Sequence, residues 1–265
     1  MIEFDDVTRC YGDKIAVEQL SLVVSAGELF AYLGPNGAGK TTTIKMLVGL
    51  LRPTSGTLRV CGHDMADWPR AARRLVGYVP DEPFLYEKLS GREFLRFVAE
   101  MYGTPTAEVD TFIQREVERF ELGEFVDSLA ETYSHGMKQR TVFASAMLHD
   151  PPVLVIDEPM VGLDPRSARI VKDLLREQVA GGTTVFMSTH TLAVAEEIAD
   201  RIGIICNGRL ERVGTLGELL SDAGTEYPSL EEAFLDVTQR RQVGHASVES
   251  VGDVLPELGG GDGGG

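Results

Sequence analysis

The chain has 265 residues, 43% of them hydrophobic, and its 41 acidic against 25 basic residues give a net charge of −16. This length is sufficient for one domain, or one domain with a subdomain, around a full core. The strong negative charge disfavours nucleic acid and anionic lipid as direct partners. No apolar run reaches the roughly eighteen residues that span a bilayer, and the acidic start, residues 1–6, is unlike a signal peptide. We therefore expect a protein that stays inside the cell and does not itself cross a membrane.

Short apolar runs alternate with helical patterns along the chain, which is typical of a mostly parallel α/β sheet. The expected strands are residues 29–33, 76–79, 153–156, 184–187 and 202–205. Residues 84–148 contain no strand pattern, so they predict a helical subdomain inserted into the α/β core. Its first helix is expected after Ser90, which forms a capping box with Glu93, and another helix is expected over 106–120.

The C-terminal part follows a different pattern. A polar linker at 221–224 precedes a second capping box, Ser229 with Glu232, and a short amphipathic helix. Residues 251–265 are rich in glycine and predict a disordered tail. We therefore expect three parts: a domain over 1–220 with its helical subdomain at about 84–148, a helical extension over 221–250, and the tail.

The first expected strand runs into the pattern G-x-x-x-x-G-K-T, which is the phosphate-binding P-loop. Its glycines let successive backbone N–H groups turn toward phosphate oxygens, and the following helix N-terminus adds its positive dipole end. Lys40 is expected to reach the outer phosphates, and the Thr41 hydroxyl to bind Mg²⁺. The predicted nucleotide-binding residues here are Gly34, Pro35, Asn36, Gly37, Ala38, Gly39, Lys40, Thr41 and Thr42.

Two acidic residues follow the expected strand 153–156. Asp157 and Glu158 stand at the end of a buried strand, where a doubly wound sheet places its ligands. Beside a P-loop, this pattern suits Asp157 to bind Mg²⁺ and Glu158 to act as a general base.

The segment 133–140, Tyr-Ser-His-Gly-Met-Lys-Gln-Arg, precedes this acidic pair and leads into a helix. Together with the spacing to Asp157, it resembles the signature motif of the ATP-binding cassette (ABC) family. That family usually has Leu-Ser-Gly-Gly-Gln here, so the chain keeps Ser134 and Gly136 and departs at Tyr133, His135 and Met137. The resemblance extends from about residue 6 to residue 220. It implies a P-loop NTPase (RecA-like) fold with an N-terminal antiparallel β part.

The resemblance also implies roles for single residues. Tyr11 matches the aromatic residue that stacks on adenine, and His190 matches the switch histidine that contacts the γ-phosphate and orients the attacking water. Asp164 matches the D-loop residue that reaches across a dimer of two cassettes. In such a head-to-tail dimer, Ser134 and Gly136 bind the ATP held by the partner's P-loop.

Asp81 stands where the family usually has a glutamine that touches Mg²⁺. A carboxylate is a good ligand for a hard cation, so Asp81 is a further candidate metal ligand. The alternative is that Asp81 only caps its turn. The neighbouring residues 83–86 are apolar, and in the family this surface receives a short helix of a membrane subunit.

We interpret the chain as the ATP-binding and ATP-hydrolysing subunit of an ABC transporter, with ATP and Mg²⁺ as cofactors. It would power transport, with export favoured, through a separate polytopic membrane permease and together with a second ATPase subunit. The expected location is the cytoplasm, peripheral on the inner face of the cell membrane. One alternative is a soluble ABC ATPase acting in DNA repair or translation. The other is a P-loop kinase or GTPase, and the signature segment argues against it because neither of these classes needs a signature helix.

Overall fold

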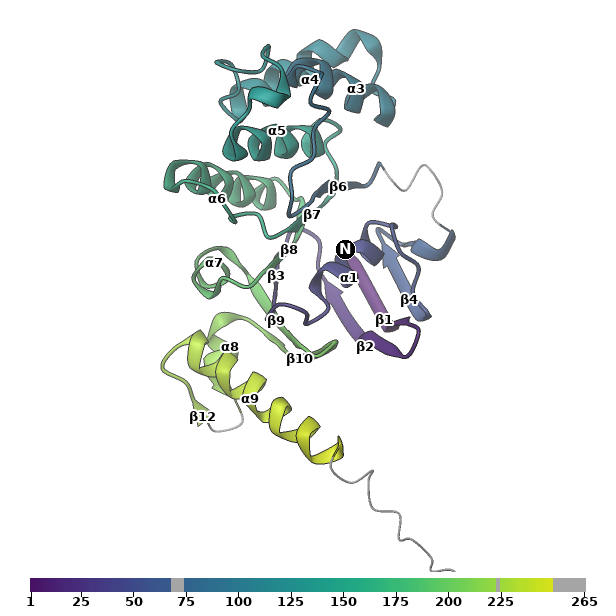
Figure 1. Cartoon of the computed structure of the whole chain (residues 1–265), viewed down its shortest axis with the longest axis vertical. Helices are drawn as coiled ribbons and strands as arrows, with labels where there is room; N and C mark the ends of the chain where they lie inside the picture. The colour runs from purple at the N-terminus through teal and green to yellow at the C-terminus, as the bar shows by residue number, and fades with distance from the viewer. Residues whose placement is uncertain (68–73, 223–224, 250–265) are drawn as a thin grey trace, which may run out of the picture.

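A six-stranded sheet forms the centre of the protein, shown in Figure 1 as a computed structural model that describes residues 1–67, 74–222 and 225–249. The strand order is β10-β9-β3-β8-β7-β6; the first pair is antiparallel and all the others are parallel. This confirms the mostly parallel α/β core. The strands are β3 (Leu29–Leu33), β6 (Val76–Val79), β7 (Val153–Asp157), β8 (Thr184–Thr189), β9 (Arg201–Cys206) and β10 (Arg209–Gly214).

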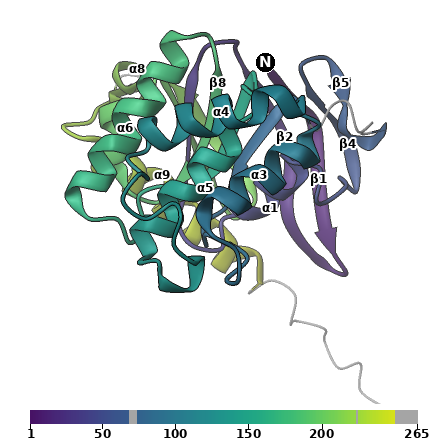
Figure 2. The ribbon, with the colours of Figure 1, turned by 90° about the horizontal axis from the view of Figure 1, so that it is seen from above.

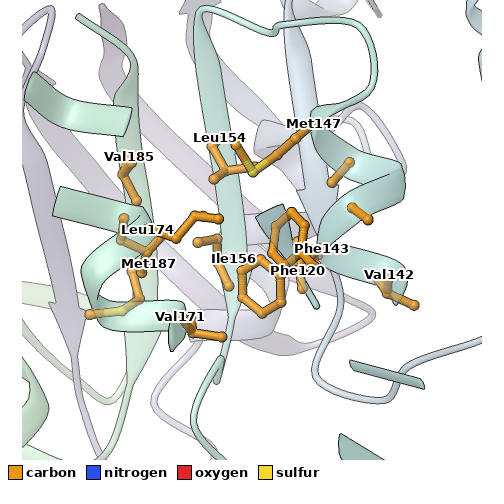
Figure 3. Close-up of a cluster of buried hydrophobic side chains, with 14 of the residues drawn as sticks. Phe120, Val142, Phe143, Met147, Leu154, Ile156, Val171, Leu174, Val185 and Met187 are labelled. Atoms are coloured by element: carbon orange, nitrogen blue, oxygen red, sulfur yellow. The ribbon is translucent and has the colours of Figure 1, made fainter. Parts of the chain in front are cut away.

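The central strands read as continuous apolar runs because both faces of the sheet are covered. In β3, Leu29, Ala31 and Leu33 enter the core on one face. Phe30 and Tyr32 alternate with them and enter a second core on the opposite face. Helices α5 (His135–Met147) and α6 (Pro165–Ala180) cover the first face, and Figure 3 shows their side chains packed on those of β7 and β8.

An antiparallel sheet lies on the opposite side, as the family resemblance implies. Its order is β2-β1-β4-β5, and it packs with α1 (Lys40–Leu47) over the second core. Phe4 of β1 and Phe186 of β8 meet there with ring centroids 6.2 Å apart. The strands are β1 (Ile2–Tyr11), β2 (Lys14–Val24), β4 (Ser55–Val60) and β5 (His63–Asp64), followed by the short helix η1 (Met65–Asp67).

A helical subdomain is inserted between β6 and β7, as the sequence predicts. It contains α3 (Gly91–Tyr102), α4 (Thr106–Arg119), η2 (Ala130–Thr132) and α5 (His135–Met147). Figures 1 and 2 show these helices gathered beyond one end of the sheet. The expected capping box is present, because the Ser90 side chain accepts from Glu93 N–H while the Glu93 side chain accepts from Ser90 N–H.

The chain after β8 forms α7 (Leu192–Ile198), then β9, β10 and α8 (Leu216–Leu220). The predicted linker at 221–224 differs from the structure, because its first two residues form β11 (Ser221–Asp222), which pairs with β12 (Thr225–Glu226). Helix α9 (Leu230–Glu249) follows, with Ser229 Oγ accepting from Glu232 N–H at 3.3 Å. The predicted tail at 251–265 lies outside the described residues. In the described ranges, no helix combines the length and apolarity that a membrane crossing requires.

Candidate nucleotide site

A cavity of about 780 Å³ lies at the carboxyl ends of the parallel strands. It brings together residues that are far apart in the sequence, because β3, β8, β7 and β6 are neighbours and each ends at this edge. Ten predicted site residues line it: Tyr11, Pro35, Asn36, Gly37, Gly39, Lys40, Thr41, Thr42, Asp81 and Glu158. The lining also includes five residues that sequence reasoning missed: Lys14, Ile15, Ala16, Asn207 and Gly208.

The P-loop takes a backbone shape that depends on glycine. Gly37 and Gly39 have φ of 80° and 110°, which L side chains rarely adopt. A Cβ on Gly39 would lie 2.5 Å from the Ala16 carbonyl oxygen, and one on Gly34 would lie 2.6 Å from the Ile205 carbonyl oxygen. The loop is therefore wedged between β2 and β9. Gly34 and Ala38 belong to the same loop but do not line the cavity, because they pack against the protein on its other side.

Lys40 is buried and its ammonium group is held inside the loop. Its Nζ donates to the carbonyl oxygens of Gly34 at 2.7 Å and Pro35 at 3.2 Å. Glu158 Oε1 lies 3.5 Å from the same nitrogen. The positive charge thus stands between the P-loop and the acidic end of β7.

Asp157 is the last residue of β7, and its carboxylate is buried. Oδ1 accepts from the Ser188 hydroxyl on β8, whereas Oδ2 has no hydrogen-bond partner among the described residues. Burial raises the pKa of Asp157, the Ser188 and Thr41 hydroxyls lower it, and the charges of Asp81 and Glu158 raise it. A buried oxygen with a free lone pair beside the Thr41 hydroxyl fits a hard cation such as Mg²⁺.

Glu158 and His190 are in direct contact. Each follows the end of a neighbouring strand, and His190 Nδ1 lies 2.9 Å from Glu158 Oε2. The backbone N–H of His190 donates to the same oxygen at 3.3 Å. Glu158 has φ of 50°, an uncommon conformation for a residue with a side chain. Such strain persists where surrounding contacts hold it, and it is frequent at functional sites.

Asp81 lies just beyond the end of β6 and is exposed at the cavity. Within the ranges that the structure describes, its carboxylate accepts no hydrogen bond, so the alternative of a turn cap has no supporting contact. Its charge still reaches its neighbours. Together with burial and Asp157, it raises the pKa of Tyr78 to about 12.

Tyr11 lies at the mouth of the cavity, with 45% of its surface exposed. The guanidinium of Arg9 stands 4.7 Å from its ring centroid. Ile15 of β2 lines the same mouth, while Asn207 and Gly208 approach from the β9–β10 hairpin. Asn-Gly predicts such a tight turn, and both residues have the positive φ that it needs, but the pair alone gives no sign of its place beside the P-loop.

The remaining predicted residues form a second cluster at the N-terminus of α5. Ser134 is its N-cap, and its Oγ accepts from Met137 N–H at 3.3 Å. Asp164 caps α6 by accepting from the backbone of Arg166 and Ser167 at 3.0 Å each. A Cβ on Gly136 would lie 3.8 Å from Asp164 Oδ2, so the two caps are neighbours. None of these residues lines the P-loop cavity as the structure describes it.

Where the family usually has the first glycine of its signature motif, this chain has His135, which packs on Val161 and Gly162, just before Asp164. Its Nε2 lies 3.3 Å from the Val161 carbonyl oxygen. A Cβ on Gly162 would come within 2.9 Å of the His135 ring, and Gly162 has φ of 73°. The exposed Ser134 cap and its exposed neighbour His135 thus face outward together.

Fold and cavity together define an ATP-binding protein of the P-loop class. The family described as ABC transporter matches residues 17–161. The daunorubicin/doxorubicin resistance ATP-binding protein DrrA of Streptomyces peucetius is 41% identical over 224 residues, which cover 84% of this chain and 68% of DrrA. The Nod factor export ATP-binding protein I of Paraburkholderia xenovorans is 38% identical over 220 residues, covering 83% of this chain and 72% of that protein.

Solved structures give the same result. An ATP-binding subunit of an ABC transporter superimposes with a TM-score of 0.84 at 37% identity, covering 89% of this chain and 99% of that one. A dimeric ATP-binding cassette in a post-hydrolysis state with ADP and Pi superimposes with a TM-score of 0.75 at 25% identity, covering 82% of this chain and 99% of its own. The chain belongs to the ABC transporter family, and it is an ATP-binding ATPase subunit of that family.

Proposed function

We propose that the chain hydrolyses Mg-ATP in the cavity, with Tyr11 stacked on adenine and the P-loop amides around the phosphates. The observation that carries the proposal is the group formed by Lys40, Glu158 and His190 at the carboxyl ends of adjacent strands. In this proposal the group provides a cation, a base and an orienting imidazole at one edge of the sheet. These are the parts that phosphoryl transfer to water requires.

The residues act by position and charge. Lys40 exchanges its contacts with the loop carbonyls for the outer phosphates. Glu158 accepts the proton of the attacking water, and His190, bound to Glu158 Oε2 through Nδ1, orients that water and contacts the γ-phosphate. The strained backbone at Glu158 keeps its carboxylate aimed at the cavity.

We propose that Thr41, Asp157 and Asp81 hold the Mg²⁺ ion. The unpartnered Asp157 Oδ2 and the exposed Asp81 carboxylate would supply oxygen donors in addition to the Thr41 hydroxyl. Bound there, the ion would neutralise negative charge on the phosphates and favour the ionised form of Asp157.

The second cluster supports a proposal of head-to-tail pairing with another ATPase subunit. Ser134, Gly136 and Asp164 would then complete the partner's nucleotide site, with the α5 N-terminus directed at the γ-phosphate. The solved relative in a dimeric state with ADP and Pi is consistent with such pairing. The second subunit is either a copy of this chain or a related one.

An exposed apolar patch on the helical subdomain supports a membrane partner. We define it by Phe84, Tyr86, Phe97 and Met101, of which Phe84 is 69% and Met101 72% exposed. The Tyr86 ring meets those of Phe84 and Phe97 edge to face at 5.6 and 5.5 Å. Isolated exposed apolar residues are ordinary, but a contiguous aromatic cluster marks a binding surface.

We propose that this patch receives a polytopic permease subunit and that the transport is export, as in the names of the drug resistance and Nod factor relatives. The subunit would then work in the cytoplasm, peripheral on the inner face of the membrane. We also propose the division into residues 1–220, with the helical subdomain at about 84–148, an extension at 221–250 and a tail. No observation favours the alternative in DNA repair or translation.

Replacing the proposed base tests the mechanism. Glu158→Gln keeps the shape of the side chain but accepts no proton, so ATP hydrolysis should fall by about 10²- to 10⁴-fold while ATP still binds. ATP should then trap a dimer, which size-exclusion chromatography with light scattering detects. Full hydrolysis by the Glu158→Gln protein would contradict the assignment of the base.

A further inference from the structure

Tyr133, the residue directly before the Ser134 cap, joins three segments of the helical subdomain. It is buried, and its ring meets Phe125 edge to face with centroids 4.9 Å apart. Its hydroxyl donates to the Phe125 carbonyl oxygen at 2.8 Å and accepts from the Gly91 N–H at 3.1 Å. Leucine, the usual residue at this position in the family, would fill similar apolar space but make neither hydrogen bond.

Gly91, the first residue of α3, is fitted to this hydroxyl. A Cβ on Gly91 would lie 2.5 Å from Tyr133 Oη, whereas the next nearest atom, the Val126 carbonyl oxygen, would be 3.2 Å away. The hydroxyl therefore occupies the space of a side chain at position 91. Glycine at 91 and tyrosine at 133 form a matched pair.

Further contacts tie the same segments together. Arg92 N–H donates to the Val126 carbonyl oxygen and Ala130 N–H to the Leu89 carbonyl oxygen, both at 2.9 Å. From within α5, the Arg140 guanidinium stands 5.1 Å from the Phe125 ring centroid. The start of α3 and the start of α5 are thus both bound to the turn that contains Phe125 and Val126.

The apolar patch belongs to the same unit. Tyr86 precedes this paired segment, and Phe97 and Met101 lie on α3 itself, one turn apart. A displacement of the patch would therefore reach the start of α3, and from there the Tyr133 hydroxyl is one hydrogen bond away.

We infer that Tyr133 is a positioning residue that fixes the Ser134 cap to the N-terminus of α3, and through α3 to the apolar patch. Its significance for hydrolysis rests on the proposed role of Ser134 at the partner's ATP. The hydroxyl transmits movement between the apolar patch and the start of α5. A leucine at this position could make that link only by packing.

The cap itself provides a readout that needs no nucleotide. Met137 N–H donates to Ser134 Oγ at 3.3 Å and Lys138 N–H to the Ser134 carbonyl oxygen at 3.0 Å. Tyr133→Phe removes only the hydroxyl, so hydrogen exchange at these two amides, followed by NMR, should become about 5- to 30-fold faster. Tyr227→Phe is the matched control, because it removes a hydroxyl that donates to Asp236 at 2.6 Å in the C-terminal part. Unchanged exchange in Tyr133→Phe would overturn the inference.

A second experiment uses the matched pair. Gly91→Ala alone should accelerate exchange at Met137, whereas Gly91→Ala added to Tyr133→Phe should change it little, because the clashing hydroxyl is gone. Equal effects of Gly91→Ala in both backgrounds would show that the hydroxyl does not join the two sites.

The functional readout is ATP-dependent dimerisation in the Glu158→Gln protein. Tyr133→Phe should raise the ATP concentration for half-maximal dimer by about 5- to 30-fold, with unchanged ATP affinity of the monomer. An unchanged dimerisation midpoint together with faster amide exchange would refute the link to Ser134 function. Failure of the Glu158→Gln parent to dimerise would refute the proposed pairing, while the exchange experiment would still decide whether Tyr133 holds the cap.

Discussion

The P-loop and the signature segment each lead into a helix N-terminus that we propose binds phosphate, yet they differ in how closely they follow the family sequence. The P-loop keeps its family pattern, and Gly39 has φ of 110° with a backbone oxygen 2.5 Å from where its Cβ would stand. The signature segment departs at Tyr133, His135 and Met137 and still forms a capped helix. A loop that must fold around a phosphate needs glycine, whereas a straight helix start needs a cap and free N–H groups.

The side chains of the signature segment show how the departures are accommodated. In place of a capping-box carboxamide, the Met137 sulfur accepts from Ser134 N–H at 3.4 Å. His135 contacts the Val161 carbonyl oxygen, and Tyr133 reaches Gly91 and Phe125. The capped helix start therefore forms although three residues of the segment depart from the family pattern.

The largest expected effect is the loss of stabilisation by Mg-ATP when the P-loop lysine is removed. At about a hundred times its dissociation constant, Mg-ATP should stabilise the protein by about 2.7 kcal/mol, a melting-temperature rise of about 5 to 10 °C. Lys40→Ala should abolish most of this rise, because the buried ammonium group is then missing from the phosphate site. Differential scanning fluorimetry with and without Mg-ATP measures both. A wild-type melting temperature that ignores millimolar Mg-ATP would contradict the site.

The same glycine-to-alanine substitution is expected to have very different effects in the P-loop and in the signature segment. Gly39→Ala must accept a positive φ and a backbone clash, so it should lower stability by about 2 kcal/mol or more and prevent ATP binding. Gly136→Ala meets no atom closer than 3.7 Å and has ordinary φ, so its melting temperature should stay within about 1 °C of wild type. Any loss in Gly136→Ala should be confined to ATP-dependent dimerisation. Equal destabilisation by both substitutions would show that the signature segment depends on glycine as much as the P-loop does.

Much of this site follows from sequence because its motifs stand directly after strands. An apolar run ending in Asp157 and Glu158 fixes both the strand and the edge where its ligands lie. Ile15 and Asn207 could not be found in this way, because they reach the cavity from hairpins whose packing depends on the whole fold. The same reason hides the contact between Tyr133 and Gly91, which are 42 positions apart.

A third prediction uses the raised pKa of Asp157. A raised pKa in the folded protein means that its ionised form is disfavoured on folding, so this group contributes stability below its unfolded pKa and loses it as pH rises through the folded pKa. At pH 7 without metal, Asp157→Asn should therefore raise the melting temperature by a few degrees. This corresponds to the free-energy cost of leaving one buried polar group without a hydrogen bond. Stabilisation by Mg-ATP should decrease in the same protein. A metal-free melting temperature that falls would contradict an unfavourable burial of the Asp157 carboxylate, whose Oδ2 has no partner among the described residues.

The smallest expected effect concerns Asp81, where the P-loop side itself departs from the family. If its carboxylate binds Mg²⁺, Asp81→Asn removes one charge from the metal's surroundings and should raise the Mg²⁺ concentration for half-maximal ATPase rate by a few-fold. Asp81→Gln should be milder than Asp81→Ala, because it restores the usual amide oxygen of the family. If Asp81 only caps its turn, Asn should cap as well as Asp, and the Mg²⁺ concentration for half-maximal rate should stay unchanged. Unaltered magnesium dependence and wild-type rate in Asp81→Asn would remove Asp81 from the metal site and leave Thr41 and Asp157 as its protein ligands.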